Sequence, residues 1–248
     1  MRIAFSEDSP WRSAPPGELH LGRKDVHVWR AWLDVSASYV KSFRELLSIE
    51  EVSQAERFYL ICNRHRYVVA RGLLRTILGR YLRIEPERLL FGYNDHGKPF
   101  LAFPGDIQRV SFNLAHSSGM ALFAFAYPDR RIGIDLEKIR TVASLDLISR
   151  RFFPPDDCAA LEIMPEPLKS QSFFRSWTQM EAYGKALGTG LTTALKDGKI
   201  SLHDQTLSQG RECLDKSVWS MHCWHPAPEY VAALAVEGND WHLKYWGV

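Results

Sequence analysis

The sequence predicts an α+β protein made of two similar halves, each an antiparallel sheet packed against a long helix. Three observations lead to this prediction. Segments that alternate between apolar and polar residues, typical of half-buried strands, occur in both halves of the chain. Each half also has one long segment with helical spacing of its apolar residues, 57–83 and 173–188. The order of strand, short helix, long helix and further strands occurs twice, which predicts an internal duplication with pseudo-twofold symmetry.

The first half supplies one set of these elements in order. A strand is expected at 26–35, a short helix at 42–58 and the long helix at 57–83. Alternating strands then follow at 98–103 and 110–127, and the second of these is interrupted by a turn signal at HSSG. The first half therefore reads as one complete α+β unit.

The second half repeats the pattern after the sequence Tyr-Pro-Asp at 127–129. The expected elements are a strand at 130–139, a short helix at 148–161, the long helix at 173–188, and strands at 199–203, 218–225 and 229–237. We therefore expect halves at 1–128 and 129–248, with an active site at their interface that draws residues from both.

Composition limits the classes of partner. The chain has 248 residues, of which 46% are apolar and 24% charged, as expected for a globular protein with a substantial core. Its 31 Lys and Arg against 29 Asp and Glu give a net charge of +2, so neither nucleic acid nor a membrane surface is expected as a partner. The N-terminal residues lack the apolar region of a signal peptide, and no apolar run is long enough to span a bilayer, so a cytoplasmic location is expected.

Two carboxylates lie two positions apart in the apolar segment GIDLEKIR, residues 133–140. Because side chains alternate along a strand, Asp135 and Glu137 project from one face while Ile134 and Leu136 project from the other. Two neighbouring like charges repel each other. The segment is therefore either a surface strand with a solvated polar face or one side of a cation site.

The long helix at 57–83 contains seven arginines and no acidic residue. Helical spacing places Arg64, Arg71 and Arg75 on one face, which is interpreted as the solvated face. Arg66 instead falls on the apolar face, where a guanidinium needs an anionic partner. Either a structural ion pair or a phosphate group would satisfy it.

The long helix at 173–188 places a further acid near its apolar stripe. Glu181 lies at the edge of that stripe, one turn before Lys185. This spacing is typical of a surface ion pair, but it would also allow Glu181 to complete a three-carboxylate site with Asp135 and Glu137. His116 ends an expected strand, where it is either a turn residue or a ligand-binding group.

Together these motifs resemble a known family. GIDLEKIR, then RRFF and WTQMEAYGKALGTGL, resembles the paired signature of the 4′-phosphopantetheinyl transferase superfamily, in which a G-[IV]-D-[IV]-E strand precedes a W-[ST]-x-K-E-[AS]-x-x-K helix. HGKPFL, FNLAHSSG and RHRYVVARGLLR are similar to upstream blocks of its surfactin-type branch, which is two-halved and monomeric. The blocks cover most of residues 50–191 in the family's order.

The resemblance implies an Mg²⁺-dependent enzyme of the holo-[acyl-carrier-protein] synthase type. Such an enzyme transfers 4′-phosphopantetheine from coenzyme A to a serine of an apo acyl or peptidyl carrier protein, and it releases adenosine 3′,5′-bisphosphate. By position in the motifs, the metal ligands for Mg²⁺ or Mn²⁺ would be Asp135, Glu137 and Glu181, the catalytic residues Asp135, Glu181 and Lys185, and the coenzyme A ligands Arg66, Lys98, His116 and Lys185. Glu181 could be the general base or only a metal ligand.

The chain departs from the family pattern at several positions. Met180 stands where the family usually has Lys, and Ala115 where it often has Ser, while Glu51 and Gln54 occupy positions that can be basic. Loss of these polar groups is expected to weaken coenzyme A binding. A catalytically weak relative that binds coenzyme A or a carrier protein is therefore the alternative. A metal-dependent phosphohydrolase would use the same acids, but it would not account for the HGKPFL and FNLAHS blocks.

Overall fold

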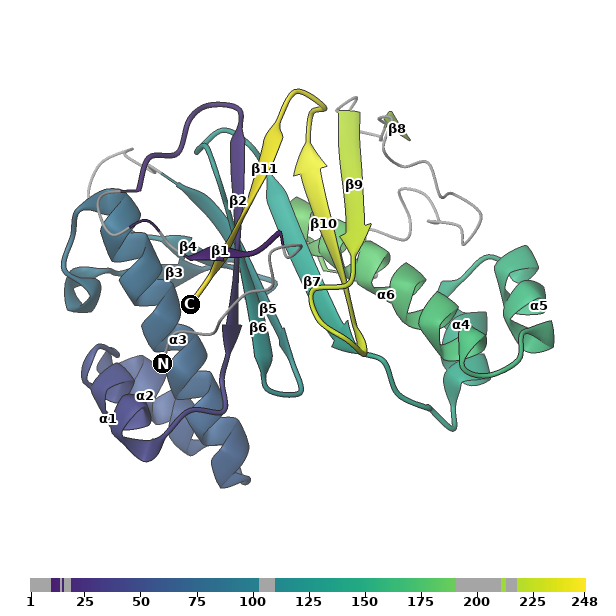
Figure 1. Cartoon of the computed structure of the whole chain (residues 1–248), viewed down its shortest axis with the longest axis horizontal. Coiled ribbons are helices and arrows are strands. Elements are labelled where there is room, and N and C mark those ends of the chain that lie inside the picture. Colours follow the sequence, from purple (N-terminus) through teal and green to yellow (C-terminus); the bar gives the residue numbers. More distant parts are fainter. Residues whose placement is uncertain (1–9, 14, 16–18, 103–109, 191–210, 213–217) are drawn as a thin grey trace.

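Two sheets lie face to face at the centre of the molecule, and helices cover their outer faces (Figure 1). The structure is a computed structural model, and it describes residues 10–13, 15, 19–102, 110–190, 211–212 and 218–248. Within these residues, the arrangement confirms the predicted α+β class.

The first sheet has the strand order β1-β11-β2-β6-β5. Its strands are β1 (Arg12–Ser13), β2 (Asp25–Trp32), β5 (Ser111–Ser117), β6 (Met120–Ala126) and β11 (His242–Gly247). β2, β6 and β5 are antiparallel neighbours, but β11 runs parallel to β1 and β2. The antiparallel pairing predicted for this half is therefore observed for β2, β6 and β5, while β11 adds parallel pairs with β1 and β2. β11 comes from the expected second half, 129–248, but pairs in the first sheet.

Three helices accompany the first sheet: α1 (Ala37–Glu45), α2 (Ile49–Glu56) and α3 (Ile61–Leu82). The short helix expected at 42–58 is in fact α1 and α2. The chain breaks between them because Ser48 starts a new helix with a capping box: its hydroxyl accepts a bond from the Glu51 N–H, and the Glu51 carboxylate accepts one from the Ser48 N–H. A 3₁₀ turn, η1 (Pro86–Arg88), and the hairpin of β3 (Phe91–Tyr93) and β4 (Pro99–Leu101) follow α3.

The second sheet is antiparallel and has the order β7-β10-β9-β8. Its strands are β7 (Ile132–Lys138), β8 (Arg211–Glu212), β9 (Val218–Trp224) and β10 (Tyr230–Glu237). The long helix α6 (Leu168–Leu187) packs on β7 and β10. The expected helix at 148–161 is instead α4 (Leu145–Phe152) and α5 (Pro155–Ile163), because Pro154 and Pro155 interrupt helical bonding. The strand expected at 199–203 lies outside the described residues.

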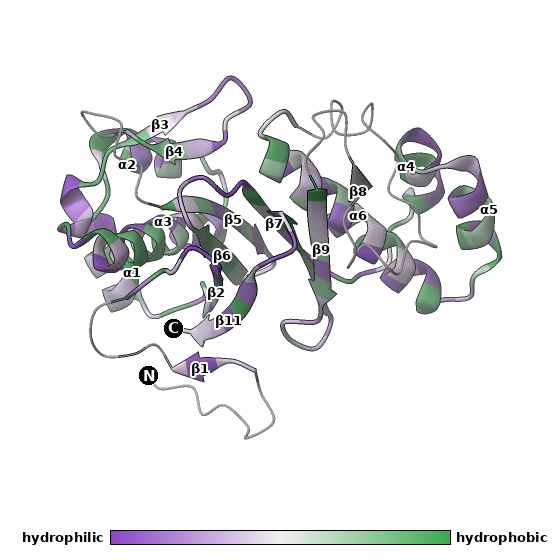
Figure 2. Ribbon diagram, turned by 90° about the horizontal axis from the view of Figure 1, so that it is seen from above, coloured by the Kyte–Doolittle hydropathy of each residue, from purple (hydrophilic) through white to green (hydrophobic). Residues whose placement is uncertain are grey.

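Three hydrophobic cores hold the layers together. One lies between α3 and the first sheet, one between the two sheets, and one between α6 and the second sheet. Ile132, Ile134 and Leu136 of β7 are buried in the middle core, which confirms the alternation predicted for this strand. Figure 2 shows the hydrophobic residues concentrated on β5, β6 and β7, where the halves meet. No helix of the described part is both long and apolar enough to cross a membrane.

Candidate active site

A close approach between β7 and α6 builds the centre of the candidate site. A Cβ atom on Gly133 would lie 2.1 Å from the carbonyl oxygen of Ala182 and 2.3 Å from the amide nitrogen of Ala186. Only glycine therefore lets the helix backbone lie this close to the strand. Because Asp135 follows Gly133 on the same face of β7, the helix brings Lys185 directly to it.

Asp135 and Lys185 form the innermost ion pair of the site. Lys185 Nζ donates to Asp135 Oδ1 at 2.7 Å, and Asp135 is only 6% exposed. Burial raises the pKa of Asp135, and the neighbouring Lys185 charge partly opposes that shift. The second oxygen, Oδ2, is buried and has no hydrogen-bond partner. An uncompensated buried carboxylate oxygen is unfavourable unless a cation or a donor completes its surroundings.

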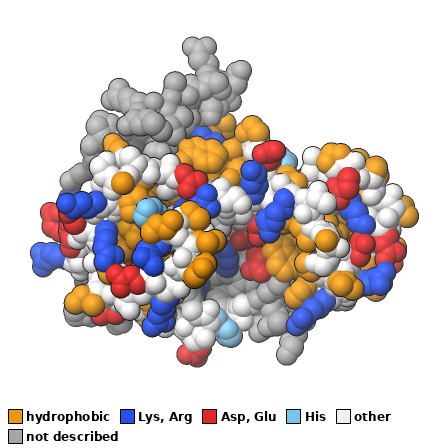
Figure 3. Space-filling view, turned by 90° about the horizontal axis from the view of Figure 1, so that it is seen from below, with side chains coloured by type: hydrophobic (Ala, Val, Ile, Leu, Met, Phe, Trp, Pro, Cys, Tyr) orange, Lys and Arg blue, Asp and Glu red, His pale blue; other side chains and the backbone are white. Residues whose placement is uncertain are grey.

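Glu137 and Glu181 lie half-buried beside this pair. Desolvation raises the pKa of both groups, and the negative charge of Asp135 raises each further. Their mutual repulsion also contributes to the raised pKa of Glu181, so the three acids share one electrostatic environment. Figure 3 shows acidic side chains in the hollow between the two lobes of the molecule, with Lys and Arg around them. The structure thus brings together the three acids that the sequence singled out.

The three carboxylates fit a hard divalent cation. No three His, Cys, Asp or Glu side chains of the described residues already stand close enough together to hold an ion. Two observations nevertheless favour a cation: Asp135 Oδ2 lacks a donor, and all three acids have raised pKa values. Lys185 opposes the shift of Asp135 and of Glu181, and Arg140 opposes that of Glu137, yet burial outweighs these charges. Oxygen donors of this kind suit Mg²⁺ or Mn²⁺.

His116 lies on β5, next to β7 and toward the same site. His116 is solvent-exposed, and desolvation by the neighbouring protein groups lowers its pKa. The Lys185 charge lowers that pKa further, while Asp135 opposes the shift. His116 is therefore electrostatically connected to both members of the innermost ion pair.

Lys98 is bound to backbone carbonyl oxygens in this structure. Its ammonium donates to the carbonyl oxygens of Ile132 at 3.1 Å, Lys185 at 2.6 Å and Ala186 at 3.3 Å. Desolvation, with a smaller effect of Arg131, lowers the pKa of Lys98 to about 8. An ammonium has three donors, so these carbonyls use all of them. Lys98 therefore ties the β3–β4 turn to β7 and to the C-terminal turn of α6, and its expected contact with a coenzyme A phosphate stays a prediction.

Arg66 does not lie on the buried face of α3. Its side chain is 30% exposed and donates from Nε and Nη2 to the two carboxylate oxygens of Asp34, at 2.7 and 2.8 Å. The pair rests on the tight turn after β5, where a Cβ atom on Gly119 would lie 2.5 Å from Asp34 Oδ2. Of the two partners that the sequence left open, the structure contains the carboxylate.

The arginine face interpreted as solvated is in fact covered: Arg71 and Arg75 are buried, and Arg64 is half-buried. Arg71 is 5% exposed and Arg75 2%, and both donate to Glu51 at distances of 2.5 to 2.8 Å. Arg75 also donates to the carbonyl oxygens of Pro86 and Leu89. The helical-wheel interpretation failed because α2 and the segment after α3 cover this face of the helix. Glu51, at a position that can be basic in the family, supplies the buried negative charge.

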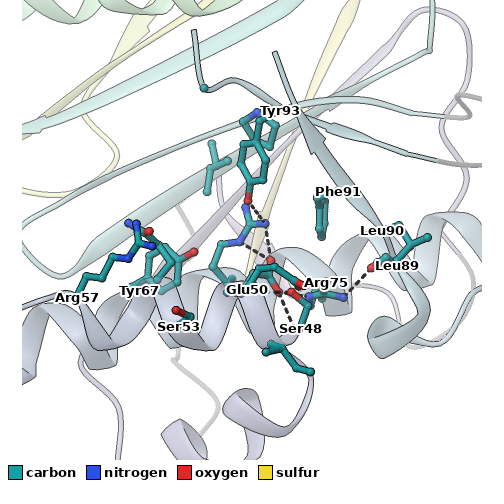
Figure 4. A pocket seen from close by; sticks show the side chains of 17 residues that line it. Ser48, Glu50, Ser53, Arg57, Tyr67, Arg75, Leu89, Leu90, Phe91 and Tyr93 are labelled. Atoms are coloured by element: carbon teal, nitrogen blue, oxygen red, sulfur yellow. Dashed lines mark hydrogen bonds and ion pairs between the residues drawn. The ribbon is translucent and has the colours of Figure 1, made fainter. Parts of the chain in front are cut away.

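This buried cluster forms one wall of a large pocket, with a volume of about 920 Å³ (Figure 4). Its lining includes Ser48, Glu51, Ser53, Gln54, Arg57, Tyr67, Arg71, Arg75, Phe91 and Tyr93. Desolvation raises the pKa of Tyr67 to about 12, so this phenol is neutral at physiological pH. Gly97, Pro99 and Leu114 also line a second cavity of about 220 Å³, which reaches Glu181 and Lys185. The pocket therefore adjoins the cavity that reaches the acidic site.

Two of the departures from the family pattern are buried in cores. Met180 is 2% exposed in the core beneath α6, and Ala115 lies in the core between the sheets. In this chain both side chains are therefore part of the packing, and the expected weakening of coenzyme A binding stays a prediction.

Two side chains that no sequence motif singled out connect the two sheets at this site. Asn113 Oδ1 accepts a bond from the Ile134 N–H at 2.8 Å, and Ser117 Oγ donates to Glu137 Oε2 at 3.0 Å. A polar residue between Phe112 and Leu114 in an apolar strand was the available signal, because a buried amide needs a partner.

Comparisons with known proteins agree with the motifs. The family model described as 4′-phosphopantetheinyl transferase superfamily matches residues 131–235, and the model described as 4′-phosphopantetheinyl transferase, N-terminal, matches residues 30–126. The chain is 39% identical over 236 residues to 4′-phosphopantetheinyl transferase HetI of Nostoc sp., covering 95% of this chain and 97% of that protein. It is 28% identical to 4′-phosphopantetheinyl transferase Sfp of Bacillus subtilis over 161 residues, or 65% of this chain and 69% of that protein.

Proposed function

The chain belongs to the 4′-phosphopantetheinyl transferase superfamily, and from this premise we propose that it transfers the 4′-phosphopantetheine arm of coenzyme A to a serine hydroxyl of an apo acyl or peptidyl carrier protein. The serine oxygen forms a bond to the phosphorus that bears the pantetheine arm, and the bond from that phosphorus to the bridging oxygen of the diphosphate breaks. Adenosine 3′,5′-bisphosphate leaves with the bridging oxygen.

One observation carries this proposal. The three acids of β7 and α6 stand with Lys185 at the junction of the halves, beside a cavity that adjoins the large pocket. Displacement at a diphosphate needs charge neutralisation at the reacting phosphorus and a separate site that holds the nucleotide. The two adjoining cavities offer both.

We propose that Asp135, Glu137 and Glu181 hold a Mg²⁺ ion, which Mn²⁺ could replace. The ion would supply charge neutralisation for the diphosphate. Asp135 is suited to this role because Oδ2 is buried without a donor, and Glu137 because Ser117 engages only one of its oxygens.

The other charged residues act on the substrates. Lys185 would leave Asp135 Oδ1 for a diphosphate oxygen, since the cation then balances the aspartate. The raised pKa of Glu181 brings it closer to the range in which a carboxylate accepts a proton, so Glu181 can take the serine proton directly or through water. Arg66, Lys98 and His116 remain proposed coenzyme A ligands, and Lys98 also holds the end of α6 in position.

The large pocket is the proposed site of the nucleotide end of coenzyme A. Its volume lies in the range typical of ligand pockets, and three arginines against two glutamates line it. The excess positive charge favours an anionic ligand.

Mass spectrometry of an apo carrier protein tests the function directly. With the wild-type protein, coenzyme A and Mg²⁺, we expect the carrier to gain the mass of one phosphopantetheine arm, and a carrier whose acceptor serine is changed to alanine should gain none. Asp135→Asn should abolish the gain, because it removes one charge from the cation site while preserving side-chain shape.

The same experiment separates the alternatives. Adenosine bisphosphate released without a modified carrier would indicate a phosphohydrolase. Coenzyme A binding without any product would indicate a binding-only relative. An unchanged rate in the presence of a chelator would refute the proposed metal requirement.

A further inference from the structure

The two sheets meet at two strand edges that lie side by side. β5 is the last strand of the first sheet, and β7 is the last strand of the second, and the two are in contact. An edge strand exposes N–H and C=O groups that need partners when they are buried. No backbone ladder joins β5 to β7 among the described residues.

Side chains of β5 take the place of that ladder. Asn113 Oδ1 accepts from the Ile134 N–H at 2.8 Å, and Ser117 Oγ accepts from the Lys138 N–H at 3.1 Å. The two acceptors are four residues apart, as are the two donors. The bonded amides therefore bracket the stretch that contains the two acids of β7, and they fix this stretch against the first half of the molecule.

Ser117 does more than satisfy a backbone group. Its hydroxyl also donates to Glu137 Oε2 at 3.0 Å, so one oxygen contacts both the main chain after Glu137 and its carboxylate. Arg140 also contacts Glu137 Oε2, at 3.5 Å. No described residue donates to the other oxygen, Glu137 Oε1. The serine thus holds one carboxylate oxygen and leaves the other free to bind a cation.

The turn that carries Ser117 is itself fixed by both halves. The Tyr230 hydroxyl, from β10, donates to the carbonyl oxygen of Ser118 at 2.7 Å, and the Leu33 N–H donates to that of Gly119 at 2.7 Å. A hydroxyl on such a constrained turn offers a well-defined direction to its acceptor.

We propose that Ser117 is a positioning residue that orients Glu137 as a ligand of the catalytic cation. The inference rests on the proposed function, and it adds a residue from the other half of the chain to the cation site. Groups that hydrogen-bond to metal ligands typically change metal affinity by about 10- to 100-fold when they are removed.

Binding of Mn²⁺ to the full-length protein without coenzyme A, followed by electron paramagnetic resonance, tests the inference. Ser117→Thr keeps the hydroxyl, and the valine of Ser117→Val has nearly the same shape as threonine but no hydroxyl. Comparison of these two variants therefore isolates the hydrogen bond. We expect Ser117→Val to raise the Kd for Mn²⁺ by about 10-fold or more, and Ser117→Thr to restore most of the affinity. In a Glu137→Gln background, Ser117→Val should cause little further loss.

Ser220 provides a matched control. Ser220 lies on β9 of the second sheet, away from the acids, and its hydroxyl donates to the carbonyl oxygen of Gly238 at 2.6 Å. Ser220→Ala should lower the melting temperature but leave the Kd for Mn²⁺ unchanged.

The outcomes distinguish this inference from the proposed function. If wild-type protein binds Mn²⁺ and the valine variant binds it equally well, Ser117 does not position Glu137, although the cation site stands. Equal weakening by threonine and valine would likewise overturn the inference, because shape rather than the hydroxyl would be responsible. Wild-type protein that modifies a carrier but binds no Mn²⁺ would overturn both the metal assignment and this inference.

Discussion

Replacement of Gly133 by alanine should separate α6 from β7 and disable the site. The new Cβ atom would lie 2.1 Å from the Ala182 carbonyl oxygen, whereas ordinary contact begins at 3.4 Å. The difference requires the helix to move by about 1.3 Å, because both nearby groups belong to the backbone and cannot rotate away. A rigid shift of this size would lengthen the 2.7 Å bond between Lys185 and Asp135 to about 4 Å.

The magnitude follows from this displacement. Overpacking in a core costs about 1–3 kcal/mol, and the backbone clash places Gly133→Ala near the upper end of that range. For a chain of this size, a loss of about 3 kcal/mol corresponds to a fall in Tm of about 6–12 °C. A misplacement of about 1 Å in a catalytic site can reduce the rate by about 100-fold.

The assay combines thermal unfolding with the initial rate of carrier modification at a temperature where the variant is folded. Gly72→Ala is the matched control, since its Cβ atom would lie 2.6 Å from the side chain of Phe43, in the first half and away from the acids. We expect a lower Tm in both variants but a lower kcat only in Gly133→Ala. Wild-type kcat in Gly133→Ala, with the expected fall in Tm, would refute the argument that the spacing of α6 from β7 sets the site.

Three further predictions concern charge. Glu51→Gln should lower the free energy of unfolding by about 3–5 kcal/mol, because it leaves two buried guanidiniums uncompensated. Asp34→Asn breaks a partly exposed pair and should lower it by about 1 kcal/mol or less, so equal losses in urea titrations would contradict this prediction. Met180→Lys should destabilise the fold without tightening coenzyme A binding, because position 180 is in the core. Tighter, salt-sensitive coenzyme A binding measured by calorimetry would disprove this prediction. The folded-state pKa values of Glu137 and Glu181 are raised, so ionisation of these groups opposes folding at neutral pH. The Tm of the metal-free protein should therefore rise, relative to the double glutamine variant, as the pH falls through the raised pKa values toward the ordinary value of 4.5. Parallel pH profiles of the two proteins would argue against this.

Much of the acidic site was predictable because its determinants are local. The period of two along β7 separates Asp135 and Glu137 from the apolar residues between them, whatever the strand packs on. The one-turn spacing of Glu181 and Lys185 on α6 likewise follows from helix geometry. The α+β class and the positions of both long helices depend on the same periodicities.

The pairing of charges was not predictable in this way. The helical spacing of the arginines on α3 is correct, but it does not say which face is covered, and α2 with Glu51 covers the face interpreted as solvated. Lys98 similarly donates to carbonyl oxygens at the end of α6, which its motif did not indicate. Such partners are distant in sequence, so no local pattern reveals them.

The sequence by itself determined which side chains share a face of a strand or helix and, through its motifs, the family. Only the tertiary structure decided which faces are buried, where β11 pairs, and how Gly133 and Ser117 bring two halves of the chain to one group of acids. The physical reason is that periodicity is set by backbone geometry within a few residues. Burial and the compensation of charge depend instead on what packs against a surface, and here those partners come from distant segments of the chain.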